Sequence, residues 1–156
     1  MDNNDFYTFS EYMKKEGNSL TASMEDYLEM IYRLSANTGF TRIHELSDAL
    51  NVQPPSATNM VKKLGELKLL KYEKYGILIL QKSGKLLGKA LLKRHNTIEE
   101  FLRLLGVSES EVLEETEKVE HTLSLATLKC IEEFISFMKD NPEIKNNFIT
   151  YCKVEE

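Results

Sequence analysis

A pair of prolines separates two short amphipathic segments near the middle of this 156-residue chain. Ile43 to Leu50 carries apolar residues at the spacing of a short helix, and Asn51-Val52-Gln53-Pro54-Pro55 interrupts it. Proline cannot continue a helix but fits the first turn of the next one. We therefore predict a second helix from about Pro55 to Leu67, whose inward face holds Ala57, Met60, Val61, Leu64 and Leu67. Two short helices joined by a tight turn favour a helix-turn-helix.

Two apolar, β-compatible runs follow the second helix. They are Leu69 to Tyr72 and Ile77 to Leu80, and Glu73 to Gly76 lies between them as a predicted hairpin turn. A hairpin in this place is the wing of a winged helix, with Lys74 and Tyr75 at its tip. The alternative is a small α+β module whose basic face is only solvated.

The net charge of -5 conceals an uneven distribution along the chain. Residues 41–95 hold 11 Lys and Arg against 4 Asp and Glu, whereas residues 96–156 hold 6 against 14 and residues 1–40 hold 3 against 7. Phosphate contacts need Lys and Arg gathered on one local surface. The basic middle segment is therefore typical of a nucleic-acid-binding module joined to a different kind of domain.

The polar face of the second helix and the wing supply the candidate DNA contacts. A recognition helix places short polar side chains near base edges and lysines near phosphates. The predicted DNA-binding residues are Arg42, Gln53, Pro55, Ser56, Thr58, Asn59, Lys62, Lys63, Lys74 and Tyr75.

The remainder of the chain is expected to be helical. Ser83-Gly84 opens a long helix that Gly106 ends near Leu105, and Ser108-x-x-Glu111 is a predicted capping box. Ser124 would cap a helix to about Met138, and Asn141-Pro142 would start the last one. The helix after Ser124 has a wide apolar face that fits either a homodimer seam or internal core packing, formed by Leu123, Leu125, Leu128, Ile131, Phe134, Ile135 and Met138.

Carboxylates and imidazoles gather in three stretches on either side of the basic segment. Residues three or four apart share one face of a helix, so Asp26 converges with Glu29, and Glu117 converges with Glu120 and His121. His95 lies between these two clusters in the sequence. Acidic helix faces are often only solvated, but together these side chains form an oxygen-rich, nitrogen-containing donor set that suits Mn²⁺ or Fe²⁺.

Several short stretches together resemble the diphtheria-toxin-repressor family of metalloregulators, most closely its manganese-responsive, MntR-like branch. The resemblance covers about residues 23–140 and is carried by Ser23 to Glu29, Tyr72 to Tyr75, Lys93 to His95, Glu99 to Arg103, Gly106-Val107 and Glu120-His121. It implies a homodimeric winged-helix repressor that binds a palindromic operator when loaded with Mn²⁺, or alternatively Fe²⁺, with one or two ions per subunit. The family's ligand positions fall on Asp26, Glu29, His95, Glu117, Glu120 and His121.

The resemblance also implies a mainly α fold with a small β-wing, in which a winged helix-turn-helix DNA-binding domain joins an α-helical metal-binding and dimerisation domain. We expect an N-terminal extension at residues 1–22, the DNA-binding domain at 23–94 and the helical domain at 95–156. The extension departs from the family pattern and is predicted to form a helix around Phe9 to Lys15. We also expect the SH3-like third domain of the iron-responsive relatives to be missing.

Other classes of protein fit the sequence less well. The acidic N-terminus lacks an apolar stretch typical of a secretory signal, and no apolar run approaches the ~20 residues of a transmembrane helix. Cys130 and Cys152 are too few for a disulfide framework. These features predict a cytoplasmic protein with reduced thiols and no membrane partner.

Two other functions are compatible with parts of the sequence. A di-metal oxidase needs Glu three residues before its histidines, but Leu92 and Lys118 stand there before His95 and His121. We therefore expect no enzymatic activity. The other alternative is a winged-helix regulator that senses an organic ligand, with the acidic cluster incidental.

Overall fold

The structure is a computed structural model that describes residues 20–153. The chain divides into two compact units, residues 1–92 and residues 93–156, and each is described by itself. The dividing point lies within helix α5 (Lys82–Leu105), so residues 82–92 of this helix belong to the first unit and residues 93–105 to the second. The predicted N-terminal helix at residues 9–15 lies outside the described residues.

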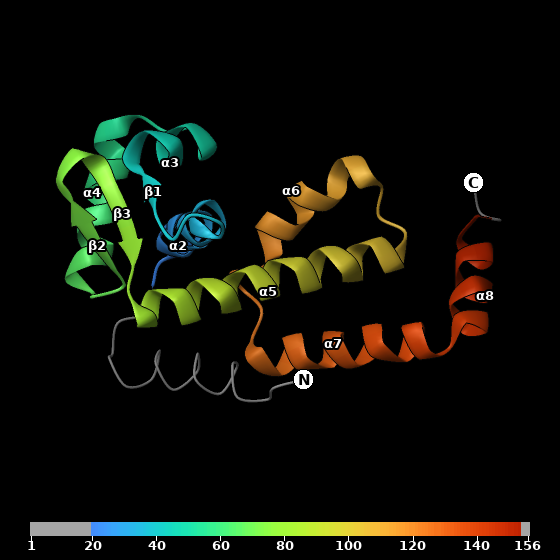
Figure 1. Cartoon of the computed structure of the whole chain (residues 1–156). Coiled ribbons are helices and arrows are strands. Elements are labelled where there is room, and N and C mark those ends of the chain that lie inside the picture. Colours follow the sequence, from blue (N-terminus) through green and yellow to red (C-terminus); the bar gives the residue numbers. More distant parts are fainter. Residues whose placement is uncertain (1–19, 154–156) are drawn as a thin grey trace. The chain divides into compact units, whose positions relative to one another are not determined.

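The first unit is a winged helix-turn-helix, as the sequence predicted (Figure 1). Its elements are α2 (Ala22–Ser35), β1 (Thr41–Arg42), α3 (Ile43–Ala49), α4 (Pro54–Glu66), β2 (Leu70–Glu73), a 3₁₀ turn η1 (Lys74–Gly76) and β3 (Ile77–Leu80). The three strands form one antiparallel sheet in the order β1-β3-β2. The fold class is therefore confirmed, with small differences in the ends of the elements.

One apolar core holds the first unit together. The predicted inward face of α4 is confirmed, since Ala57, Val61 and Leu64 are fully buried and Met60 and Leu67 are partly buried. The core is completed by side chains of α2, α3, β2, β3 and the first half of α5, and by Leu69 just before β2. They include Leu28, Ile31, Leu46, Leu70, Leu78, Leu87 and Leu91. Burial of so many leucine and isoleucine side chains is the main force that fixes α4 against the sheet.

The turn between α3 and α4 has a specific backbone conformation. Leu50 ends α3, and Asn51 adopts the left-handed region with φ 51°. Asparagine tolerates this region better than most residues, and helices commonly end there. The Val52 backbone N–H then donates to the Ser47 carbonyl at 2.9 Å, and Pro54 begins α4. Helix α4 thus begins one residue earlier than the predicted start at Pro55.

Strand β1 was not predicted from the sequence. Thr41 pairs with Leu78 and Arg42 with Ile77, so this two-residue strand lies at the edge of the wing sheet. Two residues are too few to show the alternation that identifies a strand. At the other side, β2 continues through Glu73, and the wing turn contains only Lys74, Tyr75 and Gly76.

The second unit contains the end of α5 with α6 (Glu109–Val119), α7 (Leu125–Asp140) and α8 (Pro142–Lys153) (Figure 1). The rings of Phe101 on α5 and Phe134 on α7 meet edge to face, with centroids 5.7 Å apart. Ion pairs also join α5 to α7, from Lys93 to Glu132 at 3.0 Å and from Lys139 to Glu100 at 2.7 Å.

Most predicted helix ends in this unit are confirmed, with one correction. Gly106 ends α5 with φ 92°, and the Ser124 hydroxyl accepts from the Thr127 N–H at 3.1 Å. Ser108 is the N-cap of α6, but the predicted capping box does not form. Its hydroxyl instead donates to the Glu111 carboxylate at 2.5 Å, so the two side chains satisfy each other.

The predicted apolar face of Leu123 and α7 is only partly buried within the chain. Leu128, Ile135 and Met138 are buried within the single chain, whereas Leu123, Leu125, Ile131 and Phe134 are half-buried. Among the large apolar side chains of α7 and α8, Phe137, Ile144, Ile149 and Tyr151 remain exposed. Cys130 and Cys152 are free thiols, and no helix in residues 20–153 has the length and apolarity to span a bilayer.

Candidate metal centre and nucleic-acid interface

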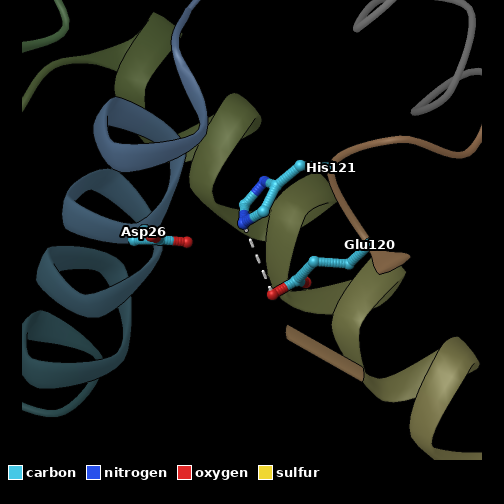
Figure 2. A group of neighbouring side chains, drawn as sticks. All are labelled: Asp26, Glu120 and His121. Carbon is cyan, nitrogen blue, oxygen red and sulfur yellow. Dashed lines mark ion pairs between the residues drawn. The ribbon is translucent and has the colours of Figure 1, made fainter. Parts of the chain in front are cut away.

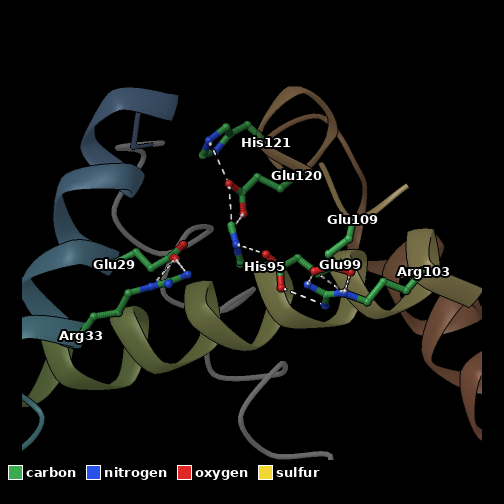
Figure 3. A network of polar contacts seen from close by, with 8 residues as sticks. All are labelled: Glu29, Arg33, His95, Glu99, Arg103, Glu109, Glu120 and His121. Atoms are coloured by element: carbon green, nitrogen blue, oxygen red, sulfur yellow. Dashed lines mark hydrogen bonds and ion pairs between the residues drawn. The ribbon is translucent and has the colours of Figure 1, made fainter. Parts of the chain in front are cut away.

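His95 and Glu120 form the centre of the candidate metal site in the second unit. The Nδ1 atom of His95 lies 3.3 Å from Oε2 of Glu120, and only 5% of His95 and 2% of Glu120 are exposed (Figure 3). These residues come from α5 and from the C-cap of α6, 25 positions apart. A carboxylate this deeply buried is costly unless a cation or hydrogen-bond donors compensate its charge.

His121 adjoins the same carboxylate from the turn that follows α6. Its Nε2 atom lies 3.8 Å from Oε1 of Glu120 (Figure 2). On its other side, Nδ1 of His121 lies 3.1 Å from the Arg94 guanidinium. A guanidinium only donates hydrogen bonds, so Nδ1 accepts this one, and a neutral His121 then carries its proton on Nε2.

Glu117 occupies a different environment from Glu120. It lies on the last turn of α6 and is exposed, whereas Glu120 is buried. Helix α6 ends at Val119, so Glu120 is its C-cap and His121 lies beyond it. The sequence predicted that Glu117, Glu120 and His121 share one face of a helix, but the helix ends before the last two, although Glu120 retains a helical backbone conformation.

Asp26 and Glu29 belong to the first unit, where they lie on α2 three residues apart (Figures 2 and 3). Glu29 is buried and accepts a hydrogen bond from Nε of Arg33 at 2.9 Å, while Asp26 is exposed. The Thr21 hydroxyl caps α2 by accepting from the Met24 N–H at 3.3 Å. This cap fixes the start of the helix that carries both carboxylates.

A second carboxylate near His95, that of Glu99, was not predicted from the sequence. Oε1 of Glu99 lies 3.2 Å from Nε2 of His95, and Oε2 of Glu99 accepts from Arg103 at 3.1 Å. Arg103 also donates to both carboxylate oxygens of Glu109, which raises the pKa of Arg103 and lowers the pKa of Glu109. The spacing of four residues between His95 and Glu99 on one helix was the available signal.

The donor set of the second unit fits a divalent cation. Within the described residues, the partners of the buried Glu120 carboxylate are the imidazoles of His95 and His121. At least one ligand-type atom of each imidazole lies within 4.8 Å of that carboxylate. Neutral imidazole and carboxylate are donors that Mn²⁺ and Fe²⁺ accept.

The candidate DNA contacts form two groups on the first unit. Gln53 is the N-cap of α4, and the exposed side chains that follow it are Pro55, Ser56, Asn59, Lys62 and Lys63. Thr58 is half-buried, and its hydroxyl donates to the Pro54 carbonyl at 3.0 Å. Arg42 is half-buried in β1, whereas Lys74 and Tyr75 are exposed in the wing turn. Tyr75 is 89% exposed and has φ 63°.

Comparisons with known proteins identify both parts of the chain. Residues 19–78 match the family described as "Iron dependent repressor, N-terminal DNA binding domain", and residues 81–148 match "Iron dependent repressor, metal binding and dimerisation domain". The HTH-type transcriptional regulator MntR of Lysinibacillus sphaericus is 44% identical over 124 residues, which cover 80% of this chain and 89% of that protein. The protein of the same name in Bacillus subtilis is 38% identical over 136 residues, covering 87% and 96%.

A solved structure agrees with these matches. The manganese regulator SloR superposes with a TM-score of 0.66 at 30% sequence identity, over 76% of this chain. The match spans 55% of the SloR chain, so the solved relative is much longer than the matched region. The chain belongs to the iron-dependent-repressor family of metal-responsive, DNA-binding transcriptional regulators.

Proposed function

We propose that this protein is a Mn²⁺-responsive repressor that binds a palindromic operator as a homodimer and controls metal-ion uptake genes. The main support for this proposal is the buried His95–Glu120 pair beside His121, in a chain whose relatives are named MntR. The name of SloR as a manganese regulator adds support for Mn²⁺ over Fe²⁺. Family membership favours a metal over an organic ligand as the signal.

We assign six residues to the ion or ions, with one or two ions per subunit. Asp26 and Glu29 come from the first unit, and the second unit supplies His95, Glu117, Glu120 and His121. The bound cation would supply positive charge that offsets the mutual repulsion of four carboxylates. Residues 23–94 would form the DNA-binding domain and residues 95–156 the metal-binding and dimerisation domain, so ligands from both would couple metal loading to operator binding.

On the operator, α4 would enter the major groove and the wing would follow the phosphate backbone. Asn59 would reach base edges, while Lys62, Lys63 and Lys74 would meet phosphates. A two-fold dimer would place its recognition helices about one helical turn of DNA apart, ~34 Å. We infer that the protein acts in the cytoplasm by binding rather than by catalysis.

Mobility-shift assays on promoter fragments of the host's own metal-transporter genes test this function. We expect a shift with Mn²⁺ that EDTA abolishes, and a weaker response to Zn²⁺ at equal free metal. Operator affinity that is the same with Mn²⁺ and with EDTA would refute the proposal.

Carboxamide variants test the assigned ligands one at a time. E120Q and E117Q should each weaken the Mn²⁺-dependent shift by about tenfold or more, because an amide oxygen is a weaker ligand than a carboxylate. E114Q is the matched control, since Glu114 is an exposed carboxylate on the same helix, paired with Lys118 at 2.7 Å. A full response of E117Q would remove this exposed residue from the ligand set.

A further inference from the structure

The imidazole of His95 lies between two carboxylates, one at each ring nitrogen. Nδ1 lies 3.3 Å from Glu120, and Nε2 lies 3.2 Å from Glu99, which follows His95 by one turn of α5 (Figure 3). The His95 side chain is 7% exposed and that of Glu99 is 20% exposed. A neutral imidazole carries one N–H, so it can donate a hydrogen bond to only one of the two carboxylates. The tautomer, with the proton on Nδ1 or on Nε2, decides which one.

Glu99 is itself held in place by a second ion pair. Its other oxygen accepts from Nη1 of Arg103 at 3.1 Å. Arg103 also forms a two-pronged contact with Glu109 at the start of α6, with Nε at 2.9 Å and Nη2 at 2.8 Å (Figure 3). Each oxygen of Glu99 thus has its own partner, which limits rotation of the carboxylate relative to the imidazole.

We propose that Glu99 is a positioning residue for the metal centre: it accepts the Nε2–H of His95, so that Nδ1, on the Glu120 side, is the nitrogen that binds the ion. Arg103 keeps the Glu99 carboxylate in the orientation that this hydrogen bond requires. The inference rests on the proposed function. Histidines that bind metals usually donate their second ring N–H to a carboxylate or carbonyl, which fixes the tautomer.

The plain alternative is that Glu99, Arg103 and Glu109 form a surface ion-pair network and no more. Glu109 and Arg103 are largely exposed, with side-chain exposures of 74% and 43%, and such pairs add little to stability. The alternative predicts small changes in thermal stability and none in metal affinity. Metal affinity therefore separates the two roles.

Three variants of the full-length protein, titrated with Mn²⁺ while free Mn²⁺ is followed by electron paramagnetic resonance, test the proposal. E99L removes the acceptor and should weaken Mn²⁺ binding ~10- to 100-fold. E99Q retains an amide oxygen that accepts the Nε2–H, so its affinity should stay within about threefold of the parent. R103M should weaken binding ~3-fold, because it frees Glu99 without removing it.

Glu100 provides the matched control. It is the neighbouring carboxylate on α5, and its partner is Lys139 at 2.7 Å rather than His95. E100Q and E100L should bind Mn²⁺ as the parent does. Equal affinity of E99L and the parent would overturn the proposal, and so would an E99Q loss as large as that of E99L, since Glu99 would then be a ligand itself.

A spectroscopic readout tests the tautomer directly. The chain has three histidines, so nitrogen-15 NMR of the Cd²⁺-loaded protein can assign each ring by single substitutions. We expect His95 to keep its proton on Nε2, and E99L to alter that signal. Cadmium bound to Nε2 would overturn the proposal. A parent protein that binds neither Mn²⁺ nor Cd²⁺ would overturn the proposed function together with this inference, whereas the E99L result affects the inference alone.

Discussion

Gly84 lies against the backbone carbonyl of Leu69, so that a Cβ added at Gly84 would be 2.9 Å from the carbonyl carbon and nearer still to the oxygen. The same carbonyl accepts the Gln81 N–H at 2.9 Å, and the Ser83 hydroxyl donates to the Lys68 carbonyl at 2.9 Å. The start of α5 is thereby joined to Lys68 and Leu69, the two residues just before β2. This contact requires glycine because backbone atoms cannot move aside as a flexible side chain can.

We expect G84A to destabilise the protein by ~3 kcal/mol, at the upper end of the range for overpacking. Urea unfolding of the metal-free protein measures this change. G65A is the control: a Cβ at Gly65 meets only the Leu70 carbonyl oxygen, at 3.8 Å, and alanine favours a helix over glycine by ~1 kcal/mol. Equal stability of G84A and the parent would contradict the packing seen at this contact.

Glu45 links pH to the stability of the helix-turn-helix. Its carboxylate accepts from the Thr41 hydroxyl at 2.7 Å and from the Arg42 N–H at 2.8 Å, and these hydrogen bonds lower the pKa of Glu45. A carboxyl whose folded pKa is lowered stabilises the fold above its unfolded pKa, and this contribution disappears as the pH falls through the folded pKa.

T41V should therefore have a lower free energy of unfolding than the parent at neutral pH. This difference in stability should become smaller as the pH falls. Urea midpoints of both proteins, measured between pH 7 and about pH 3, give the comparison. T127V is the control, because the Thr127 hydroxyl lies 3.0 Å from Ser124 and, among residues 20–153, has no carboxylate as a hydrogen-bond partner. A gap between T41V and the parent that is independent of pH would show that Glu45 is not responsible.

Local patterns in the sequence were sufficient to predict the helices and the wing. Apolar spacing identified the buried face of α4, and Gly106 and Ser124 identified helix ends, because these signals depend only on neighbouring residues. The roles of Gly84 and of β1 depend on Leu69 and Leu78, which are distant in the sequence. Such contacts arise only when the chain has folded.

In the candidate site, too, local spacing predicted some features, whereas contacts between distant residues could not be predicted. Spacing grouped Glu120 with His121, but it could not show that Glu120 is buried against His95 while Glu117 is exposed. Helix α6 ends at Val119, and the contact of Glu120 with His95 depends on how α6 packs against α5, which spacing within one helix does not show. Glu99 could have been found from its spacing to His95, yet Glu-rich helices make that signal weak.

Lys74 offers a test of the proposed wing contact. It is exposed in the wing turn beside Tyr75, where its ammonium group can meet a phosphate. K74A should weaken Mn²⁺-dependent operator binding and reduce the slope of log affinity against log salt by about one, since one fewer counterion is released. K129A, which removes an exposed lysine of α7, should leave the slope unchanged. A K74A slope equal to that of the parent would exclude a phosphate contact at this position.

Operator DNA should tighten metal binding by the same total factor by which metal tightens operator binding. This reciprocity follows from linkage, whichever residues transmit the effect, and coupling of this kind is typically ~5- to 150-fold. Mn²⁺ titrations with and without a saturating operator duplex give one factor, and operator titrations with Mn²⁺ and with EDTA give the other, each summed over all ions bound per dimer. E120Q should reduce both factors together, because it removes the Glu120 carboxylate, which contacts both His95 and His121. Two factors that disagree well beyond experimental error would mean that the ion acts on the DNA complex by a route other than the equilibrium proposed, such as aggregation of the metal-loaded protein.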